Sequence, residues 1–301
     1  MAFESIQWFP GHMAKTRRMI AENLKNVDLV IELLDARIPS SSRNPEITRL
    51  TVGKPTLLLL NKASLADASQ NRLWLRRFSG AETLPLLTDC VTGEGLNRLQ
   101  PSIKTILSEK LDRYADKGMS GRRVRAMVLG IPNVGKSSLI NRISGNKKTR
   151  VEDRPGVTRD KQWVPTNIGV DLLDMPGILW PKFEDQRVGE NLALTGAIKD
   201  DILDTESLAA LLCGRLKKTY PDLLAARYKL TEADMELSDF DLFLKIGKKR
   251  GFLLGGGEID TERTAAVLLD EFRAAKIGRI TLDQIETAGG VSDVGSLETN
   301  H

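Results

Sequence analysis

The sequence predicts an α/β protein: a parallel, doubly wound sheet followed by a small all-α C-terminal domain. Two observations support this fold class. Short apolar runs alternate with stretches of helical periodicity up to about residue 180, which is the pattern of parallel strands joined by crossover helices. From about residue 185 only helical periodicity remains. We therefore expect a sheet domain over residues 1–180, a helical domain over residues 181–287 and a flexible tail over residues 288–301.

Each expected strand is a short apolar run, and each expected helix shows the helical period. Strands are expected at residues 27–34, 55–60, 83–87, 124–129 and 170–174. Helices of the sheet domain are expected at residues 13–24, 46–50, 67–78 and 96–110 and again from residue 138, with a polar linker at residues 114–123. In the C-terminal domain, helices are expected at residues 192–200, 205–218, 239–248 and 261–275, with a glycine turn at residues 255–257.

Composition and charge exclude several classes of protein. No apolar run among the 301 residues approaches the ~20 residues that span a bilayer, and the N-terminus does not read as a signal peptide. The two cysteines, Cys90 and Cys213, make neither a disulfide framework nor a zinc site, so a cytoplasmic protein without a membrane partner is expected. The net charge of +4 and the pI near 9.0 favour a polyanionic partner, although ordinary surface charge is an equal alternative.

Residues 130–138 fit the phosphate-binding pattern G-x-x-x-x-G-K-S/T, between an apolar run and a helix start. Main-chain N–H groups of such a loop surround phosphate oxygens, and the helix N-terminus adds positive charge. Lys136 is expected to reach the β- and γ-phosphates, and the Ser137 hydroxyl to ligate Mg²⁺. A glycine-rich turn that only connects two elements is the alternative, which the strand–loop–helix context disfavours. The expected phosphate-binding residues are Asn133, Val134, Gly135, Lys136, Ser137 and Ser138.

A second phosphate-side motif, Asp174-x-x-Gly177, closes the last expected strand. The Asp174 carboxylate is expected to hold a water on Mg²⁺, and the Gly177 N–H to face the γ-phosphate. Thr158 lies in the loop before this strand, where its hydroxyl can reach Mg²⁺. The motif Asp-x-x-Gly is weak when it stands alone, but its position after the phosphate loop and Thr158 makes it specific. Lys136 and Thr158 are expected to stabilise the charge of the reacting phosphates.

The stretch Asn61-Lys62-Ala63-Ser64 resembles the guanine-reading motif Asn-Lys-x-Asp, with serine in place of aspartate. Asn61 can bond the purine edge, and the stem of Lys62 can lie along the base face. The missing carboxylate normally accepts two guanine N–H groups, so its loss should reduce base selection.

A second departure occurs at Asp89-Cys90, where Ser-Ala is usual. Cys90 can replace alanine because the expected base contact comes from the main chain. Asp89 and Ser64 together suggest a reciprocal exchange, in which Asp89 restores a carboxylate near the base edge. The alternative is two unrelated losses that leave weak base selection.

The polar, serine-rich loop at residues 35–45 follows the first expected strand. The carboxyl ends of parallel strands are where α/β proteins build their sites. The loop is therefore expected to be either part of a site or a solvated connection.

The order of the motifs indicates a circular permutation. The base-reading motifs at residues 61 and 89 precede the phosphate loop at residue 130, whereas in ordinary GTPases they follow it. Joining the old termini and opening the chain elsewhere preserves such a fold, because domain termini lie close together. The predicted architecture is thus a circularly permuted P-loop GTPase domain, in which the segment after Gly177 leads directly into the helical domain.

The chain resembles the ribosome biogenesis GTPase A (RbgA/YlqF) family of circularly permuted GTPases over about residues 7–285. The resemblance rests on the phosphate loop and on residues 8–15, 35–45, 195–199, 256–260 and 268–272. It implies a GTPase that acts late in assembly of the large ribosomal subunit and is stimulated by ribosomal particles. It also implies GTP or GDP and Mg²⁺ as ligands, an rRNA-contacting helical domain, binding to the precursor particle in the GTP state, and a monomer off the ribosome.

Two residues take specific roles from this resemblance. Ile178 stands where a water-positioning glutamine usually follows the glycine, and an apolar side chain cannot orient water. The resemblance points to His12 as the group that does so, although a simple helix-entry residue is the alternative. Asn133 marks GTPases that use K⁺ as an additional cation, unless it only stabilises the loop.

Four groups of cations are candidates for rRNA phosphate contacts, which give affinity without sequence choice. Each group taken alone reads as a solvated face. A nucleotide-gated RNA-binding scaffold with little hydrolysis, and an NTPase of relaxed specificity, remain rival functions. The four groups are Arg122, Arg123 and Arg125; Lys147, Lys148 and Arg150; Lys217 and Lys218; and Lys245, Lys248, Lys249 and Arg250.

Overall fold

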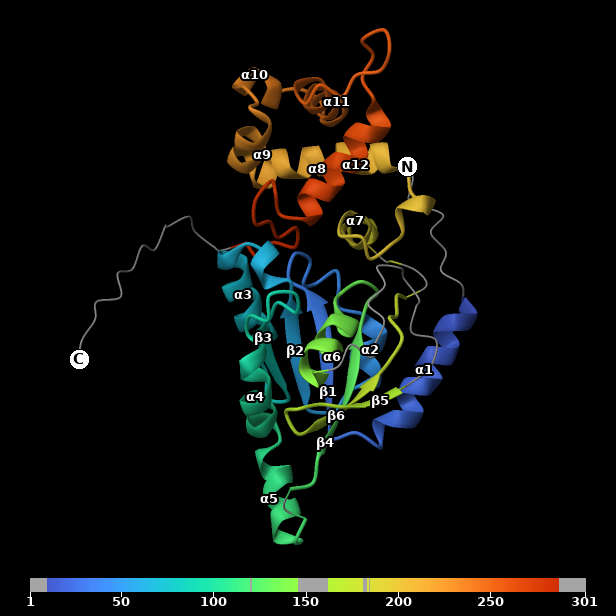
Figure 1. The fold of residues 1–301 in the computed structure, drawn as a ribbon, viewed down its shortest axis with the longest axis vertical. Helices are drawn as coiled ribbons and strands as arrows, with labels where there is room; N and C mark the ends of the chain where they lie inside the picture. Colours follow the sequence, from blue (N-terminus) through green and yellow to red (C-terminus); the bar gives the residue numbers. More distant parts are fainter. Residues whose placement is uncertain (1–9, 120, 146–161, 181–182, 184, 287–301) are drawn as a thin grey trace, which may run out of the picture.

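A six-stranded sheet forms one half of the molecule, and a group of helices lies beyond the carboxyl ends of its parallel strands (Figure 1). The structure is a computed structural model that describes residues 10–119, 121–145, 162–180, 183 and 185–286. The strands are β1 (Leu29–Asp35), β2 (Thr56–Asn61), β3 (Thr83–Leu87), β4 (Val124–Gly130), β5 (Gln162–Pro165) and β6 (Val170–Asp174). Their order is β3-β2-β1-β4-β6-β5, and every neighbouring pair is parallel except β5 with β6. The predicted parallel sheet is confirmed.

Helices cover both faces of the sheet, as a doubly wound fold requires. On one face lie α1 (Pro10–Leu24), α2 (Pro45–Leu50) and α3 (Ala68–Phe78), which bury Ile20, Ile47 and Trp74 against the strands. On the other face lie α4 (Leu99–Ile106) and α6 (Lys136–Ser144). Burying one large apolar side chain contributes roughly 1.5–3 kcal/mol, so the two-sided coverage stabilises the central strands.

Two expectations near this sheet are wrong in detail. The single helix expected at residues 96–110 is broken into η2 (Leu96–Arg98), α4 and α5 (Ser108–Asp116), with a break at Leu107. Helix α5 buries none of its residues and projects from the lower end in Figure 1, so the first part of the expected linker is helical. The edge strand β5 was not expected, because four residues are too few to show a period.

The helical region, residues 185–286, contains six α-helices among its described residues. They are α7 (Gln186–Leu194), α8 (Thr205–Thr219), α9 (Pro221–Tyr228), α10 (Glu232–Met235), α11 (Asp239–Lys249) and α12 (Thr261–Arg273), with η3 (Asp200–Ile202) between α7 and α8. Helix α7 replaces the helix expected at residues 192–200, because Asp185 caps its start and Gly196, at φ +76°, ends it. No helix of the described residues is long and apolar enough to cross a membrane.

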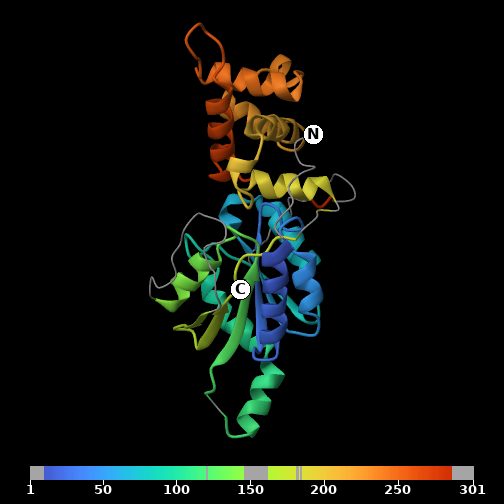
Figure 2. The same ribbon diagram turned by 90° about the vertical axis from the view of Figure 1, so that its right-hand side faces the viewer.

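The carboxyl ends of the parallel strands face the helical region, as the two perpendicular views in Figures 1 and 2 show. The order in which successive strands are added to the sheet reverses between β1 and β4. Ligands of open α/β sheets bind at such a point. The predicted motifs occupy this edge in spatial order: Asp89 beyond β3, Asn61 on β2, Asp35 on β1, Gly130 on β4 and Asp174 on β6. The expected tail at residues 288–301 lies outside the described residues.

Candidate nucleotide site

The phosphate loop connects β4 to α6, and its conformation depends on glycine. Gly135 has φ +107°, and a Cβ placed on it would lie 2.3 Å from the Asn61 side-chain nitrogen. Gly135 is also the N-cap of α6 and offers no side chain to the first helical turn. The N–H groups of that turn, which includes Ser137 and Ser138, are therefore free of a capping side chain and suited to an anion.

Lys136 is buried inside this loop. Its Nζ donates to the carbonyls of Gly130 at 3.2 Å and Ile131 at 2.9 Å. Burial lowers the pKa of Lys136 to about 8, although the nearby Asp174 carboxylate acts in the opposite direction. A phosphate placed beside the ammonium would restore the charged form, so the loop is electrostatically prepared for an anion.

The Asp174–Gly177 segment lies against the same loop. A Cβ on Gly177 would lie 2.9 Å from the Pro132 nitrogen and 3.0 Å from Lys136 Nζ. Asp174 is 1 % exposed, and neither carboxylate oxygen has a partner at normal hydrogen-bond geometry among the described residues. Burial raises the pKa of Asp174, and Lys136 and the neighbouring Met175 N–H oppose this rise. A buried carboxylate without partners is costly, and hard cations prefer such oxygens. Asp174 and Ser137 thus fit Mg²⁺.

Asn61 joins three loops at the edge of the sheet. Its Nδ2 donates to the Val134 carbonyl at 2.7 Å, and its Oδ1 accepts from the Cys90 N–H at 2.9 Å. The phosphate loop and both base-reading loops are therefore brought together as the motifs predict. The Cys90 N–H, which we expected to face the base, is engaged by Asn61 in this structure.

The two departures from the guanine-reading pattern are neighbours in space. The Ser64 hydroxyl donates to Asp89 Oδ2, while Asp89 Oδ1 accepts from the N–H groups of Val91 at 2.8 Å and Thr92 at 3.0 Å. Burial alone would raise the pKa of Asp89, but the hydrogen bonds from Ser64 and from the two main-chain N–H groups lower it. The two exchanged residues are therefore in direct contact, but Asp89 is 4 % exposed and both its carboxylate oxygens accept hydrogen bonds within the protein, so its contact with a base stays a prediction.

Lys62 lies in an ion cluster with Asp35 and Arg37. Lys62 has φ +60°, and its Nζ is 3.0 Å from Asp35 Oδ2. The same carboxylate accepts from Arg37 Nε at 2.9 Å and Nη2 at 2.7 Å. Burial would raise the pKa of Asp35, but the two cations hold it well below its usual range. The cluster lies at the carboxyl end of β1, directly beside the base-reading loop.

The loop at residues 35–45 is not a solvated connection. Arg37, at 2 % exposed, donates to the carbonyls of Arg273 at 3.2 Å and Thr195 at 3.4 Å in the helical region. Ser41 Oγ donates to Asp283 Oδ1 at 2.8 Å, and Asn44 Nδ2 donates to the Ile178 carbonyl at 3.3 Å. This loop therefore joins the sheet, the segment after Gly177 and the helical region.

Four other predicted residues have different outcomes. Ile178 is 5 % exposed and packs in the core with α1, so it cannot hold water. Asn133 is exposed, and its Nδ2 donates to the Gly196 carbonyl at 2.9 Å. His12 lies in the first turn of α1, and the placement of its side chain is outside what the structure describes. Thr158 lies outside the described residues.

Sequence reasoning missed a clamp on the base-reading loop. Arg142 of α6 donates from Nη1 to the Val91 carbonyl at 2.8 Å and from Nη2 to the Thr92 carbonyl at 2.7 Å. It ties the helix that follows the phosphate loop to the loop that carries Asp89. No motif marks Arg142, because its acceptors are main-chain carbonyls.

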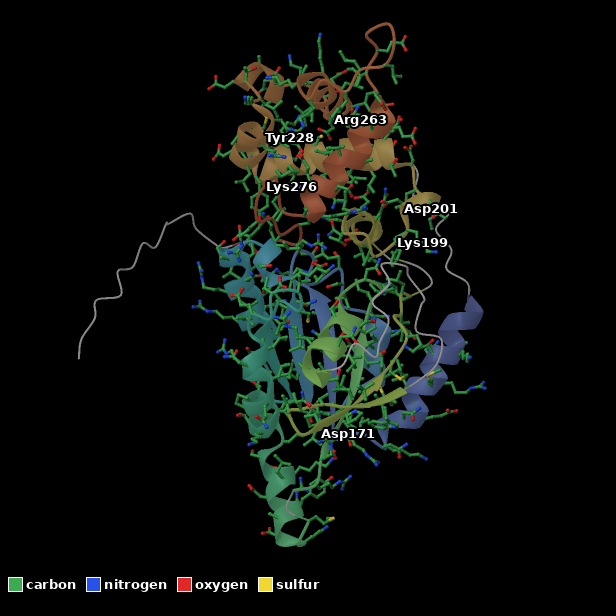
Figure 3. The ribbon with its side chains drawn as sticks, viewed as in Figure 1. Asp171, Lys199, Asp201, Tyr228, Arg263 and Lys276 are labelled. Carbon is green, nitrogen blue, oxygen red and sulfur yellow. The ribbon has the colours of Figure 1, made fainter. Side chains whose placement is uncertain are left out.

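Most cations expected at an RNA surface have partners inside the molecule. The ion pairs and stacked pairs are Arg123–Asp171, Lys245–Asp234, Lys249–Asp234, Arg250–Glu271, Arg122 over Tyr114 and Arg125 over Trp163 (Asp171 is labelled in Figure 3). Lys217 donates to the Leu237 carbonyl. Lys218 and Lys248 are exposed, and no ion pair of theirs is recorded within the described residues. Lys147, Lys148 and Arg150 lie outside those residues.

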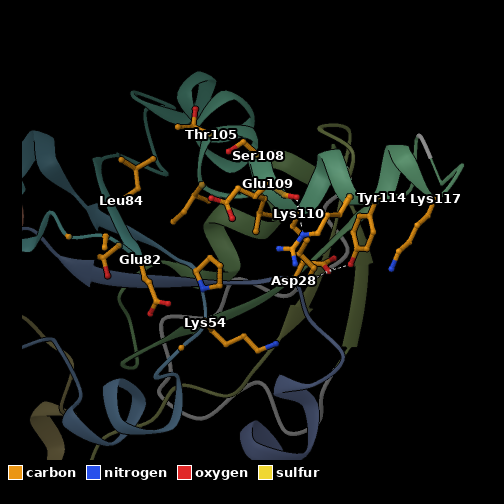
Figure 4. A pocket seen from close by; sticks show the side chains of 18 residues that line it. Asp28, Lys54, Glu82, Leu84, Thr105, Ser108, Glu109, Lys110, Tyr114 and Lys117 are labelled. Atoms are coloured by element: carbon orange, nitrogen blue, oxygen red, sulfur yellow. Dashed lines mark hydrogen bonds and ion pairs between the residues drawn. The ribbon is translucent and has the colours of Figure 1, made fainter.

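A cavity of about 740 Å³ lies at the opposite edge, where β1, β2 and β3 begin (Figure 4). The Asp28 carboxylate in this cavity is already paired. Its Oδ1 lies 2.7 Å from Lys110 Nζ and accepts a hydrogen bond from the Tyr114 hydroxyl at 3.0 Å. Lys54 donates to the Val27 carbonyl at 3.0 Å. None of the predicted site residues lines this cavity, so the motifs and the cavity define different places.

Known proteins resemble this chain over nearly its whole length. A family model described as 50S ribosome-binding GTPase matches residues 125–240. Ribosome biogenesis GTPase A of Bacillus licheniformis is 47% identical over 281 residues, which cover 93% of this chain and 99% of that protein. Mitochondrial ribosome-associated GTPase 1 of Mus musculus is 34% identical over 297 residues, covering 92% and 90%. The solved structure of GNP-bound YlqF from T. maritima matches with a TM-score of 0.58 at 25% identity, covering 90% of this chain and 98% of that one.

The sheet order, the phosphate loop and the earlier position of the base-reading motifs define a circularly permuted P-loop GTPase. GTP hydrolysis is accordingly the activity of this class of protein. Within the class, the chain belongs to the ribosome biogenesis GTPase A family.

Proposed function

We propose that this GTPase acts at a late step in assembly of the large ribosomal subunit. It binds the precursor particle, through rRNA and ribosomal proteins, in the GTP state and is released on hydrolysis. The names of its relatives, ribosome biogenesis GTPase A and mitochondrial ribosome-associated GTPase 1, support this role, as does the basic net charge. A cytoplasmic monomer off the ribosome is part of the proposal.

The observation that carries the nucleotide assignment is the gathering of the separate motifs at one edge of the sheet. Val134, Gly135, Lys136, Ser137 and Ser138 hold the phosphates, with Gly177 beside them. Asn61, Lys62, Ala63 and Ser64 hold the base together with Asp89 and Cys90. The hydrogen bonds of Asn61 to both the phosphate loop and Cys90 support one continuous site.

Hydrolysis in this site depends on charge stabilisation and on a positioned water. Mg²⁺, when bound, would supply positive charge to the phosphates, and the residues that would hold it are Ser137, Thr158 and, through a water, Asp174. Lys136 stabilises the charge that develops on the γ-phosphate. His12 orients the attacking water, because Ile178 is buried and no polar side chain follows Gly177 directly.

Asn133 is proposed as a ligand of K⁺ near the phosphates. Its amide nitrogen donates to Gly196, so its oxygen is the atom available to a cation. Replacing KCl by NaCl should then slow hydrolysis in the parent protein and leave Asn133→Ala unaffected, as a phosphate-release assay would show.

Co-sedimentation with large-subunit precursor particles tests the main proposal. We expect salt-sensitive binding with a non-hydrolysable GTP analogue and weak binding with GDP, because phosphate contacts are lost as salt rises. Equal sedimentation with both nucleotides would contradict a nucleotide-driven release.

A nucleotide-gated RNA-binding scaffold with little hydrolysis is the second candidate, and the buried Ile178 favours it. The variant His12→Ala separates the two functions. We expect it to lower particle-stimulated turnover on the order of 100-fold or more while nucleotide affinity is retained. Turnover equal to that of the parent would remove His12 from the mechanism.

An NTPase of relaxed specificity is favoured by Ser64, which stands where a carboxylate is usual. Titration calorimetry with GTP, GDP and ATP distinguishes this function from a strict GTPase. Affinities for ATP and GTP within a factor of about three would support the relaxed reading.

The domain division is proposed as residues 1–180 for the GTPase domain and 181–287 for the helical domain. The last described strand ends at Asp174, and the elements described after it are helical. Residues 288–301 are proposed as a flexible tail.

A further inference from the structure

The chain that follows α12 runs alongside the base-reading loop. We call residues 279–282 the strap. Arg279 Nη2 donates to the Ala63 carbonyl at 3.0 Å, and its Nε donates to the Ala66 carbonyl at 2.9 Å. The next residue, Ile280, donates its N–H to the Leu65 carbonyl at 3.2 Å. Three carbonyls of the loop after Lys62 are thus held by the helical region.

The loop at residues 62–66 has main-chain hydrogen bonds of its own, from the Leu65 N–H to Lys62 and from the Ala66 N–H to Ala63, and the strap adds donors to its carbonyls at residues 63, 65 and 66. It is a three-residue 3-10 turn, η1 (Ala63–Leu65), whose N-cap Lys62 is left-handed and makes no side-chain cap bond. A non-glycine residue in this conformation costs on the order of 1 kcal/mol and persists where surrounding contacts over-determine it. Asn71 Nδ2, at 3.1 Å from the Ala63 carbonyl, is the loop's additional side-chain donor from α3.

The strap also reaches Lys62 by a second route. The Leu282 N–H donates to the Arg37 carbonyl at 2.7 Å, and the Arg37 guanidinium holds the carboxylate of Asp35. That carboxylate lies 3.0 Å from Lys62 Nζ. Both the main chain of the loop and its lysine side chain are therefore positioned by residues 279–282 and their partners.

We propose that the strap completes the base site and that Arg279 is a positioning residue for the guanine base. Arg279 touches no nucleotide atom; it holds the loop that presents Lys62 and Ser64. Nucleotide affinity then depends on docking of the helical region, and by linkage bound nucleotide strengthens that docking to the same degree. This inference rests on the proposed assignment of the base to this loop.

A purely structural role for Arg279 makes a different prediction. Loss of stability alone would weaken binding of every nucleotide in proportion to the fraction unfolded. Loss of loop positioning weakens a ligand read at its base edge more than one held mainly by its phosphates. The ratio of GDP to ADP affinity therefore distinguishes positioning from stability.

The test uses the full chain with Arg279→Gln, Arg279→Lys and the control Lys276→Gln. Lys276 is an exposed cation on the same segment, three residues beyond the end of α12, and is labelled in Figure 3. In calorimetry we expect Arg279→Gln to bind GDP roughly tenfold more weakly, the factor that corresponds to losing about one charge-assisted hydrogen bond. ADP affinity should change by less than about twofold. Arg279→Lys should recover only part of the loss, because a single ammonium lacks the planar fork that spans two carbonyls.

Equal GDP affinity in Arg279→Gln and Lys276→Gln would overturn the proposal. A parallel loss of GDP and ADP affinity with a lowered unfolding midpoint would also overturn it, by showing a structural role. If the parent protein binds no guanine nucleotide, the proposed function itself fails instead.

A measurement on the unmodified protein does not depend on how the variants fold. Hydrogen exchange of the Ile280 and Leu282 amides, which donate to Leu65 and Arg37, should slow when GDP is added. The Asp171–Arg123 pair lies at the far end of the sheet, and amides there serve as the internal control. Unchanged exchange at residues 280 and 282 with saturating GDP would contradict coupling of the strap to the base site.

Discussion

Lys136 is an ammonium in a place where burial disfavours its charge, and this has a consequence for stability. Its pKa in the folded, nucleotide-free protein is lowered to about 8 by burial, against about 10.5 in the unfolded chain. Between these two pH values the unfolded state binds more protons. The free energy of unfolding contributed by this residue therefore rises as pH increases from 8 to 10.5, and the penalty is fully present below pH 8.

Denaturant unfolding of nucleotide-free parent and Lys136→Met at several pH values checks this. We expect the parent to gain on the order of 2–3 kcal/mol relative to the variant between pH 7.5 and 10. Parallel pH profiles for the two proteins would show that Lys136 is charged without cost in the folded state.

At the same scale, Ser64 and Asp89 can be tested by exchanging them. Asp89→Ala should weaken GTP binding on the order of 10–100-fold, because the base loses a carboxylate acceptor. The double variant Ser64→Asp with Asp89→Ser restores the usual arrangement and should recover much of that affinity. Titration calorimetry measures the GTP and ATP affinities of the parent, the single variant and the double variant.

Lys276→Gln is a suitable control for handling and folding, since this side chain is exposed and lies outside the base-reading loops. If Asp89→Ala binds GTP and ATP as the parent does, the reciprocal exchange is wrong.

At the scale of elements, the cations on the outer helices are of two kinds: some are paired with a carboxylate, and others face solvent. Lys245 and Lys249 on α11 lie 2.8 and 2.9 Å from the Asp234 carboxylate on α10, so they hold two helices together. Lys218 on α8 and Lys248 on α11 are exposed and lie on the same region. A cation already paired contributes less to phosphate binding than one that faces solvent.

We therefore expect Lys218→Gln and Lys248→Gln each to weaken rRNA binding and to reduce the slope of log affinity against log salt by about one unit. Lys245→Gln should instead leave the slope nearly unchanged and lower the unfolding midpoint of the helical region. Filter binding over a salt series, with thermal unfolding of each variant, separates these effects. Equal slopes for all three variants would place the RNA surface elsewhere.

The motifs could be predicted from sequence because each lies within one short segment with a fixed backbone role. The phosphate loop, Asn61 and Asp174 follow strands that are apolar runs, and parallel strands bring their carboxyl ends to one edge. Arg37, Arg142 and Arg279 could not be found in this way. Their long-range acceptors are main-chain carbonyls, which carry no side-chain signature, and they lie 236, 51 and 216 residues away in Arg273, Val91 and Ala63. The broken helix at Leu107 was missed for a related reason, since its period continues across the break.

At the scale of the whole molecule, α7 connects the phosphate side of the sheet to the helical region. It follows the Asp174–Gly177 segment in the chain, and its residue Asn191 is fully buried. Asn191 Nδ2 donates to Ser41 Oγ at 2.9 Å and to Asp283 Oδ1 at 2.7 Å, and its Oδ1 accepts from Arg215. One side chain thus joins α7 to the loop after β1, to the chain beyond the strap and to α8.

Asn191→Ala should lower the free energy of unfolding by about 1–3 kcal/mol, because it leaves buried partners unsatisfied. It should also reduce the difference in hydrogen exchange of α7 between the GTP-analogue and GDP states. Gln186→Ala is the matched control, since Gln186 is exposed on the same helix and, within the part of the chain that the structure describes, its side chain donates to Glu190 of that helix. An exchange difference as large in Asn191→Ala as in the control would exclude α7 as the connection.

Helix α5 projects from the body, buries none of its residues, and leads back to β4 through a glycine-containing turn. It lies at the amino ends of the strands, opposite the edge that carries the motifs. Chain added after Gly118 would therefore extend into open solvent, and a small fluorescent protein could be spliced in there as a reporter. Such a fusion would allow binding of the protein to a precursor particle and its release to be followed by single-particle imaging. The carboxyl ends of the strands, which carry the motifs, would remain unchanged.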